Sequence, residues 1–325
     1  MSEKVFYGGQ AVIEGVMMRG QRGFAVAARS PEGQIVVHAE PLRSRIYRSR
    51  WAKLPFIRGV VMLGEMLVLG MRSLMFSANV AMGEQEVQFG AKSAWGTLAF
   101  SLTMSIALFF VLPLALTGFI DSRIESSFVS NLVEGGFRLL ILVGYIYLIG
   151  RLGEIQRVFM YHGAEHKTIN ALEDGAPLTP EVVSRYGLAH PRCGTGFLLI
   201  VVLLSVLVFA LLGRPSLELR IASRILLVPV IAGIGYELVR LGARYYHVRL
   251  VRWLLAPSLA LQGLTTREPT HDQIEVAIVA LERVLADERA MAPSAESKTV
   301  AEPAVLEPAA PLPIALPRTD PATSS

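Results

Sequence analysis

The sequence predicts a mainly α-helical, polytopic membrane protein with a small N-terminal β-hairpin module, and three observations lead to this fold class. Apolar residues make up 52% of the 325-residue chain and charged residues only 18%, with a mean hydropathy of +0.47. Uncharged runs of roughly 20 residues recur, and a helix needs about that length to cross a bilayer. Lysine and arginine gather between these runs, as they do in loops that remain in the cytoplasm.

Composition and charge argue against several other classes of protein. The formal net charge is only +4, and no nucleic-acid-binding motif accompanies the basic clusters, so these clusters suit a membrane surface and not nucleic acid. Cys193 is the single cysteine, which excludes an intrachain disulfide. The first residues lack the sustained apolar core of a cleavable signal peptide, so the N-terminus is expected to stay in the cytoplasm.

The N-terminal segment, residues 1–41, is rich in glycine and predicts a small β-containing module. Residues 24–29 and 34–39 have the composition of two strands, and the Ser-Pro-Glu-Gly sequence between them is typical of a turn. Glu14 and Arg19 precede these strands. Their plainest interpretation is an ion pair within a loop.

Residues 42–95 are expected to form a basic segment followed by an amphipathic helix. Arg58, Glu65 and Arg72 recur every seven residues in an otherwise apolar stretch, so they share one narrow helical stripe. Such a helix is expected to lie in the membrane interface or against other helices rather than to cross the bilayer. The basic segment carries Arg43, Arg45, Arg48, Arg50, Lys53 and Arg58.

Residues 96–252 predict four transmembrane helices, at about residues 96–120, 136–150, 194–213 and 221–239. The connections on one side of these helices are rich in arginine and lysine, and those on the other side are short and poor in them. The positive-inside rule therefore places both termini in the cytoplasm.

Several residues within these spans predict local features. Pro113 is expected to kink its helix, and Arg138 and Arg224 are expected to extend toward the near membrane surface. Glu237 lies near the end of the last span, where an acidic side chain usually has a partner or a function. Arg240, one turn further on, is the partner that the sequence suggests.

After the spans, residues 253–289 predict a cytoplasmic amphipathic helix, which starts at a capping box formed by Thr270 and Gln273. Residues 290–325 are rich in alanine and proline, with little to bury, and are predicted to be disordered. The predicted domains are thus residues 1–41, 42–95, 96–252, 253–289 and 290–325.

The strongest chemical signal is H-x-x-E-H at residues 162–166, the pattern of one class of zinc peptidases. It follows the second span, on the same helix if that helix is unbroken. Because residues four apart lie on one helix face, His162 and His166 can reach one metal ion. Glu165 is the expected catalytic residue, a general base that takes a proton from water activated by the metal. The expected cofactor is a divalent metal ion, with zinc favoured.

A catalytic zinc site needs a third protein ligand and an open position for water. His190 and Cys193 precede the third span on the same side of the membrane, so both are predicted metal ligands. Further oxygen ligands could come from Glu14, Glu173 and Glu237. Two nearby cations are candidates to stabilise a developing oxyanion, namely Lys167 and Arg192.

Each of these residues also has a plainer interpretation. The motif histidines and Glu165 could be solvated polar groups where a helix leaves the bilayer. Cys193 could be a small buried residue at the mouth of the third span. Under these interpretations the segment has no chemical role.

Several motifs occur in the same order as in a known family, namely GGQAVIEGVMMRG, PFIRGVV, YHGAEHKTINALE, HPRCGTGF and LTTREP. On these motifs the chain resembles the DUF1385 family of YqhQ-like bacterial membrane proteins, from about residue 5 to residue 287. The resemblance implies a predicted metal-dependent enzyme. Its polar signature positions are matched by Glu14, His162, Glu165, His166, His190 and Cys193.

The sequence thus favours a metal-dependent hydrolase of the bacterial cytoplasmic membrane, in contact with the lipid bilayer and acting on a peptide or a lipid-linked substrate. The alternative is a non-catalytic membrane scaffold or transporter subunit, in which the histidines form a polar interface. Charges at the membrane edges favour this alternative, namely Arg58, Arg224 and Glu237. The spatial arrangement of the candidate ligands distinguishes the two.

Overall fold

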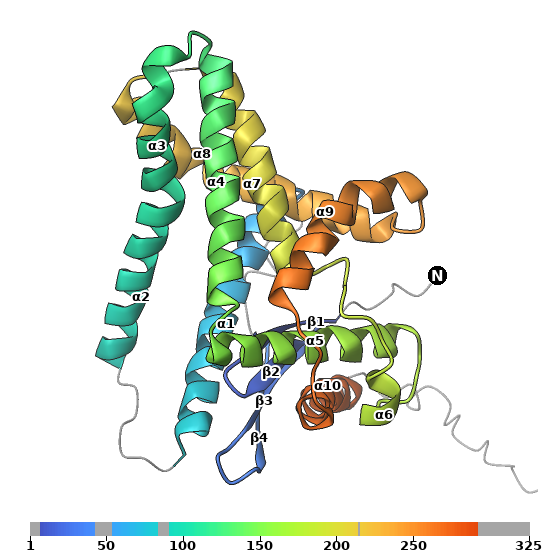
Figure 1. Ribbon diagram of the computed structural model, residues 1–325. Coiled ribbons are helices and arrows are strands. Elements are labelled where there is room, and N and C mark those ends of the chain that lie inside the picture. Colours follow the sequence, from blue (N-terminus) through green and yellow to red (C-terminus); the bar gives the residue numbers. More distant parts are fainter. Residues whose placement is uncertain (1–6, 43–53, 84–90, 214, 292–325) are drawn as a thin grey trace, which may run out of the picture. The chain divides into compact units, whose positions relative to one another are not determined.

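A computed structural model describes residues 7–42, 54–83, 91–213 and 215–291 (Figure 1). Met1–Ala290 form one compact unit and Met291–Ser325 a second, and the elements described below belong to the first unit up to the last residue of the final helix. Most of the predicted basic segment and nearly all of the predicted disordered tail lie outside the described residues, as does the side chain of Arg224.

The N-terminal module contains the predicted hairpin within a four-stranded antiparallel sheet. Its strands are β1 (Gly8–Val12), β2 (Gly15–Arg19), β3 (Gly23–Arg29) and β4 (Ile35–Pro41), in the order β1-β2-β3-β4. The predicted hairpin is confirmed as β3–β4. Both β1 and β2 begin with glycine, which is uncommon in strands, so the sequence does not predict these two strands. A Cβ at Gly15 would lie 2.2 Å from the Ala27 carbonyl oxygen, so glycine is needed where these strands pair.

The rest of the described chain is helical. The elements are α1 (Ile57–Met82), α2 (Ala91–Ile106), the π-helical turn η3 (Ala107–Val111), α3 (Leu112–Ile120), the 3₁₀ turn η4 (Asp121–Arg123), α4 (Ser127–Ile149), α5 (Gly153–Glu173), α6 (Pro180–Val183), α7 (Gly194–Leu211), α8 (Leu217–Arg244), α9 (Arg249–Thr265) and α10 (His271–Met291). The second predicted span and the His162 motif are not on one unbroken helix. A turn at Gly150 separates α4 from α5. Glycine has a low helix propensity, so it favours the end of α4 at this position.

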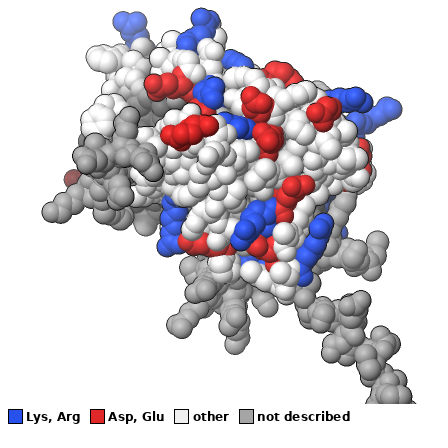
Figure 2. All heavy atoms as spheres, turned by 90° about the horizontal axis from the view of Figure 1, so that it is seen from below, with Lys and Arg blue, Asp and Glu red and all other residues white. Residues whose placement is uncertain are grey.

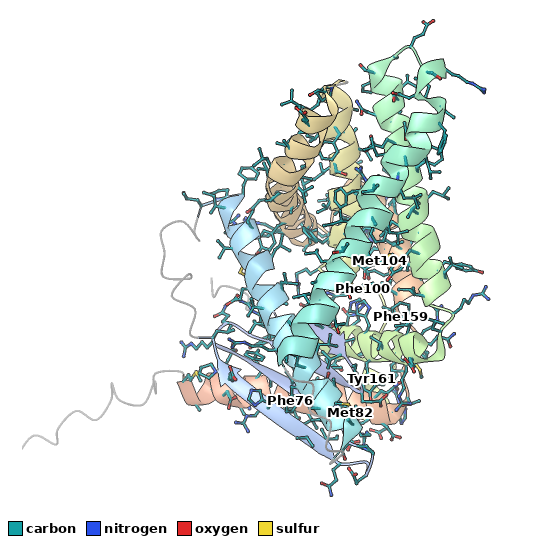
Figure 3. All side chains as sticks on the ribbon, turned by 90° about the vertical axis from the view of Figure 1, so that its left-hand side faces the viewer. Phe76, Met82, Phe100, Met104, Phe159 and Tyr161 are labelled. Atoms are coloured by element: carbon teal, nitrogen blue, oxygen red, sulfur yellow. The ribbon has the colours of Figure 1, made fainter. Side chains whose placement is uncertain are left out.

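Within the described residues, five helices are long and apolar enough to cross a membrane, which makes this a multi-pass membrane protein. Four are the predicted spans, at Gly96–Arg123, Ser127–Ile149, Gly194–Leu211 and Leu226–Arg244. The side chains of Phe100 and Met104 on α2 are 67% and 53% exposed (Figure 3), as expected for a surface that faces lipid.

The fifth apolar helix is α1, which the sequence predicts to be amphipathic and to lie in the interface or against other helices. Its second half packs on one face of the sheet, where Leu69, Met66 and Phe76 meet apolar side chains of β1, β2 and β3 (Figure 3). Each residue of its charged stripe lies near an oppositely charged side chain of another element. Arg58 contacts Glu237 of α8, Glu65 contacts Arg19 of β2, and Arg72 lies 3.8 Å from Glu40 of β4.

The other face of the sheet is covered by α5 and α10, so three distant parts of the sequence share one apolar core. It contains Val16, Met18, Ala25 and Ala27 of the sheet, Tyr161, Ala164 and Ile169 of α5, and Ile274, Ala277 and Leu281 of α10. We call β1–β4 together with α5, α6 and α10 the sheet lobe. Because both faces are covered, β2 and β3 are buried on both sides, which explains their nearly continuous apolar composition.

Glu288 of α10 closes this lobe at the turn between β2 and β3. Its carboxylate accepts hydrogen bonds from the Tyr7 hydroxyl at 2.8 Å and from the backbone N–H groups of Gln21 and Arg22 at 2.5 and 3.2 Å. Burial and this carboxylate together raise the pKa of Tyr7 to about 12. The Glu288 side chain therefore connects α10 both to the residue before β1 and to the turn between β2 and β3.

We expect Glu288→Ala to destabilise the sheet lobe by about 2 kcal/mol, because it removes a charged acceptor from several donors. Hydrogen exchange of the peptide containing Gln21 and Arg22 should accelerate. The matched control is Glu282→Ala, an exposed acid on the same helix. Equal exchange rates in the two variants would contradict the assignment.

Arg138 is buried rather than extended to the membrane surface as the sequence suggests. It pairs with Glu134 one turn earlier at 2.9 Å, and its Nε donates to the Phe109 carbonyl at 3.0 Å. Pro113 explains that acceptor, because proline has no N–H to offer the carbonyl four residues before it. This carbonyl lies in the π-helical turn η3, just before Pro113. Arg138 connects η3 to α4 through its hydrogen bond to the carbonyl.

Two further expectations from the sequence are wrong. Glu14 and Arg19 do not pair with each other, because Glu14 contacts Arg157 of α5 and Arg19 contacts Glu65 of α1. The partner of Glu237 is Arg58 of α1, with Nε and Oε1 2.6 Å apart, and not the neighbouring Arg240. In each case the true partner belongs to a distant segment, which spacing along one helix does not reveal.

Candidate metal centre

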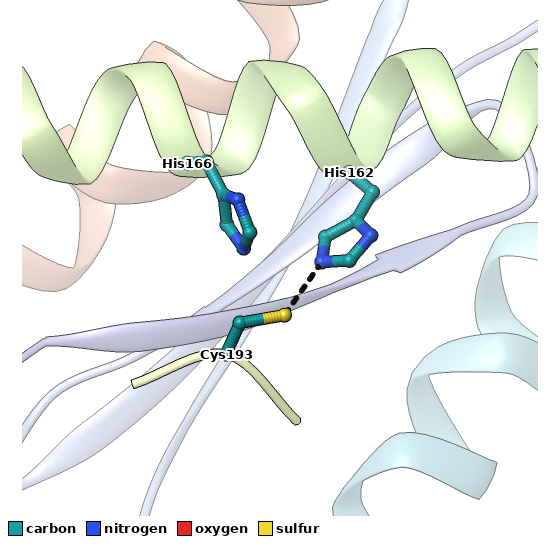
Figure 4. Close-up of side chains that lie close together, drawn as sticks. All are labelled: His162, His166 and Cys193. Carbon is teal, nitrogen blue, oxygen red and sulfur yellow. Dashed lines mark hydrogen bonds between the residues drawn. The ribbon is translucent and has the colours of Figure 1, made fainter. Parts of the chain in front are cut away.

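His162 and His166 lie one turn apart on the same face of α5, and the structure brings Cys193 of α7 to them (Figure 4). One nitrogen of each imidazole and the Cys193 sulfur all lie within 4.8 Å of one another. His166 and Cys193 are buried and His162 is half-buried. We call these three residues the His-His-Cys group. In the described part of the chain it is the one group of this kind that could hold a metal ion.

Both imidazoles are held by backbone carbonyl groups. The Nδ1–H of His162 donates to the Thr265 carbonyl at 2.9 Å, and the Nδ1–H of His166 donates to the Leu188 carbonyl. A carbonyl can only accept, so Nδ1 carries a proton in both rings, and in the neutral form of each ring Nε2 has the lone pair that a metal ion needs. Metal-binding histidines typically have this second contact, which fixes the tautomer and the ring orientation.

Gly163 lets these carbonyl groups come close to α5. A Cβ at this position would lie 2.2 Å from the Arg267 carbonyl oxygen and 2.8 Å from Cδ2 of Leu188. The Arg267 N–H in turn donates to the Phe159 carbonyl at 3.0 Å. The glycine between the two histidines therefore permits the approach of both segments that anchor them.

Cys193 occupies the N-cap position of α7. Its sulfur accepts a hydrogen bond from the Thr195 N–H at 3.4 Å and lies 3.3 Å from Nε2 of His162 (Figure 4). When the ring of His162 is neutral, with its proton on Nδ1, the thiol of Cys193 is the donor in that contact. The sulfur and both Nε2 atoms thus face one another with donor lone pairs, a soft ligand set that suits zinc.

Glu165 lies on α5 beside the His-His-Cys group, and its side chain faces β1. A Cβ at Gly9 would lie 3.0 Å from its carboxyl carbon, so the carboxylate lies directly on the strand. Burial raises the pKa of Glu165 to about 7, although the neighbouring imidazole of His162 and the N–H of Gly9 act in the opposite direction. A carboxyl with this pKa can both accept and donate a proton near neutral pH.

His190 does not join the His-His-Cys group, although the sequence predicts it as a ligand. Its ring centroid lies 5.7 Å from that of His166, and its buried Nε2 has no hydrogen-bond partner among the described residues and lies 3.9 Å from Glu173. Burial lowers the pKa of His190. Its backbone N–H and carbonyl are both bonded to the side chain of Gln262 at 3.0 Å, which fixes this segment beside the group.

The other candidate ligands and cations already have partners. Glu173 contacts Arg192, and although burial alone would raise the pKa of Glu173, the side chains of His190 and Arg192 lower it to about 2. The Lys167 ammonium group contacts the Ser184 carbonyl at 2.7 Å and Glu268 at 2.6 Å. Lys167 and Arg192 thus stabilise the lobe and are not free for an oxyanion. Glu14 and Glu237 form the ion pairs given above.

A recess of about 330 Å³ lies next to the segments whose carbonyl groups hold the two imidazoles. Leu188 and Ala189 line one side of it, and Gln262, Thr266 and Arg267 from the end of α9 and beyond line the other. Thr265, which anchors His162, lies between two of these residues. The sequence gives no signal for this arrangement beyond the LTTREP motif, because most of the contacts come from backbone atoms.

Comparison with known proteins supports the resemblance seen in the sequence. Residues 54–287 match the family described as protein of unknown function DUF1385. The uncharacterized protein YqhQ of Bacillus subtilis (strain 168) is 33% identical over 292 residues, which cover 86% of this chain and 92% of that protein. No solved structure matches the chain. The chain therefore belongs to the DUF1385 family.

Proposed function

We propose that the chain is a zinc-dependent hydrolase that acts at the cytoplasmic membrane surface on a peptide or a lipid-linked substrate. The observation that carries the proposal is the convergence of His162, His166 and Cys193, with both Nδ1 atoms fixed by carbonyl groups. Three such ligands leave a fourth position for water or substrate, as in catalytic zinc sites. A closed structural site would use four protein ligands.

The roles of the residues follow from their positions. A bound divalent ion supplies Lewis acidity and lowers the pKa of water. His162, His166 and Cys193 would hold that ion. Glu165 is the buried carboxylate next to His162, and we assign it the role of general base. The recess beside the group offers room for part of a substrate.

The orientation in the membrane is part of the proposal. Within the sheet lobe, α5 and α6 lie between the second and third predicted spans, and the surface of the lobe carries interspersed acidic and basic side chains (Figure 2). Such a surface belongs in water. The positive-inside rule then favours a bacterial inner membrane with the lobe and both termini on its cytoplasmic side.

Metal analysis tests the first part of this proposal. Protein purified without added metal should contain about one zinc ion per chain. After exchange for cobalt, a thiolate-to-cobalt charge-transfer band should appear in the wild type and be absent in Cys193→Ser. A wild type without bound metal would overturn the proposed metal centre.

Exogenous ligands test the hydrolase part. A hydroxamate or azide should change the cobalt spectrum if the fourth position is open, because such ligands occupy the place of water. Glu165→Gln should keep the metal but fail to replace the wild-type gene in a deletion strain. An inert spectrum together with full complementation by Glu165→Gln would instead favour the scaffold or transporter function.

A further inference from the structure

The first half of α9 carries an apolar stripe that no other part of the described chain covers. The side chains of Leu250, Trp253 and Leu254 are 64%, 72% and 61% exposed. Their spacing of three and four residues puts them on one helix face. Large apolar side chains grouped in this way indicate a contact surface.

The second half of the same helix is packed. Leu261 joins a core with Leu142 and Ile146 of α4 and Leu199 of α7, and Gln262 is fully buried against His190. In Figure 1 the last turns of α9 descend toward α5, and its first turns lie farther from the sheet lobe. The first half of α9 therefore exposes apolar side chains, and its second half contacts the segments that carry the candidate metal ligands.

The chain around the first half of α9 is strongly cationic. No Asp or Glu occurs between Glu237 and Glu268, a stretch that contains Arg240, Arg244, Arg249, Arg252 and Arg267. In the described structure Arg244, Arg249 and Arg252 are exposed and no carboxylate within the described residues pairs with them, whereas Arg240 lies near Glu237. Their positive charge is thus available to an anionic partner.

The position of α9 along the chain fixes its depth. The last candidate span ends at Arg244, and α9 begins at Arg249. A connection this short keeps the first turns of α9 at the membrane surface. Tryptophan and arginine are the residues that favour this interfacial layer.

From these observations we infer that the first half of α9 lies in the headgroup layer of a leaflet containing anionic phospholipid. Leu250, Trp253 and Leu254 enter the boundary between headgroups and acyl chains, and Arg249 and Arg252 contact phosphate groups. A second copy of the chain is a poorer occupant, because a symmetric contact would bring like charges together. The inference does not depend on the proposed hydrolase activity.

Fluorescence quenching by brominated lipids tests the inference. The full-length protein is changed by Trp51→Phe and Trp95→Phe, so that Trp253 is the single tryptophan. It is reconstituted in vesicles of equal parts phosphatidylglycerol and phosphatidylcholine, with bromine on one lipid or the other. We expect quenching by both lipids and roughly twofold stronger quenching by brominated phosphatidylglycerol.

A matched pair of variants isolates the arginines. Arg249→Gln with Arg252→Gln should remove the preference for phosphatidylglycerol and leave quenching by brominated phosphatidylcholine. Arg185→Gln, an exposed arginine of the sheet lobe, should keep the preference. Absence of quenching by either lipid would overturn the inference, and so would an unchanged preference in the double variant. All these residues are exposed, so their replacement does not disturb the fold.

Discussion

For the proposed zinc centre, replacing His162 with alanine is expected to lower the affinity for zinc at least tenfold, or about 1.4 kcal/mol. The change removes one of three converging ligands and leaves His166 and Cys193 to hold the ion alone. Zinc per chain, measured after dialysis against a weak chelator, should fall accordingly. The melting temperature should fall with it, because a ligand that binds the folded state stabilises that state.

Two other histidines serve as controls for this experiment. His271→Ala, an exposed histidine at the start of α10, should leave zinc unchanged. His190→Ala should keep most of the metal, because His190 lies outside the His-His-Cys group and is held there by Gln262. Loss of zinc in His190→Ala with retention in His162→Ala would contradict the assigned ligand set.

Gly163→Ala is expected to have the second largest effect, although it changes no ligand. The new Cβ would lie 2.2 Å from the Arg267 carbonyl oxygen, a backbone atom that cannot rotate away. The segments carrying Thr265 and Leu188 must then move, and these segments fix the two imidazoles. We expect a loss of about 1–3 kcal/mol in the free energy of unfolding and zinc affinity lowered roughly tenfold or more.

Thermal unfolding with and without zinc measures both effects. Gly153→Ala is the matched control, because it lies on the same helix with no atom within 4 Å of the added Cβ. It should be neutral or slightly stabilising, since alanine favours a helix over glycine. Normal zinc affinity in Gly163→Ala would show that the anchoring carbonyl groups do not hold the histidines in place.

The sequence predicts those parts of the site that depend on local spacing. The pair His162 and His166 follows from the helical repeat, and Cys193 follows from its position at the start of a span on the same side of the membrane. The sequence also predicts His190 as a ligand, because His190, like Cys193, precedes the third span on the same side of the membrane. The two differ in their packing, because Gln262 of α9 is hydrogen-bonded to the backbone of His190, which lies beside the group and not within it.

Long-range pairing explains the other differences. Arg19 pairs with Glu65, Glu14 with Arg157, and Glu237 with Arg58, each across different elements. A single sequence favours the nearest opposite charge, which is wrong in all three cases. Apolar composition likewise identifies α1 as a membrane-length helix, although half of it covers a sheet. Local composition shows how apolar a segment is, but it does not show whether the segment packs against lipid or against another part of the protein.

The shared core of the sheet lobe has a consequence for how the protein is made. Tyr7 and Glu288 are hydrogen-bonded although 281 residues separate them, and α10 supplies much of the core beneath the sheet. The ribosome therefore delivers the strands long before α10, and the part of their apolar face that α10 covers stays exposed while the membrane helices are inserted. Closure must wait until α10 has been translated. Nascent chains that stop before it expose that face, and they are the natural targets of chaperones and quality-control proteases.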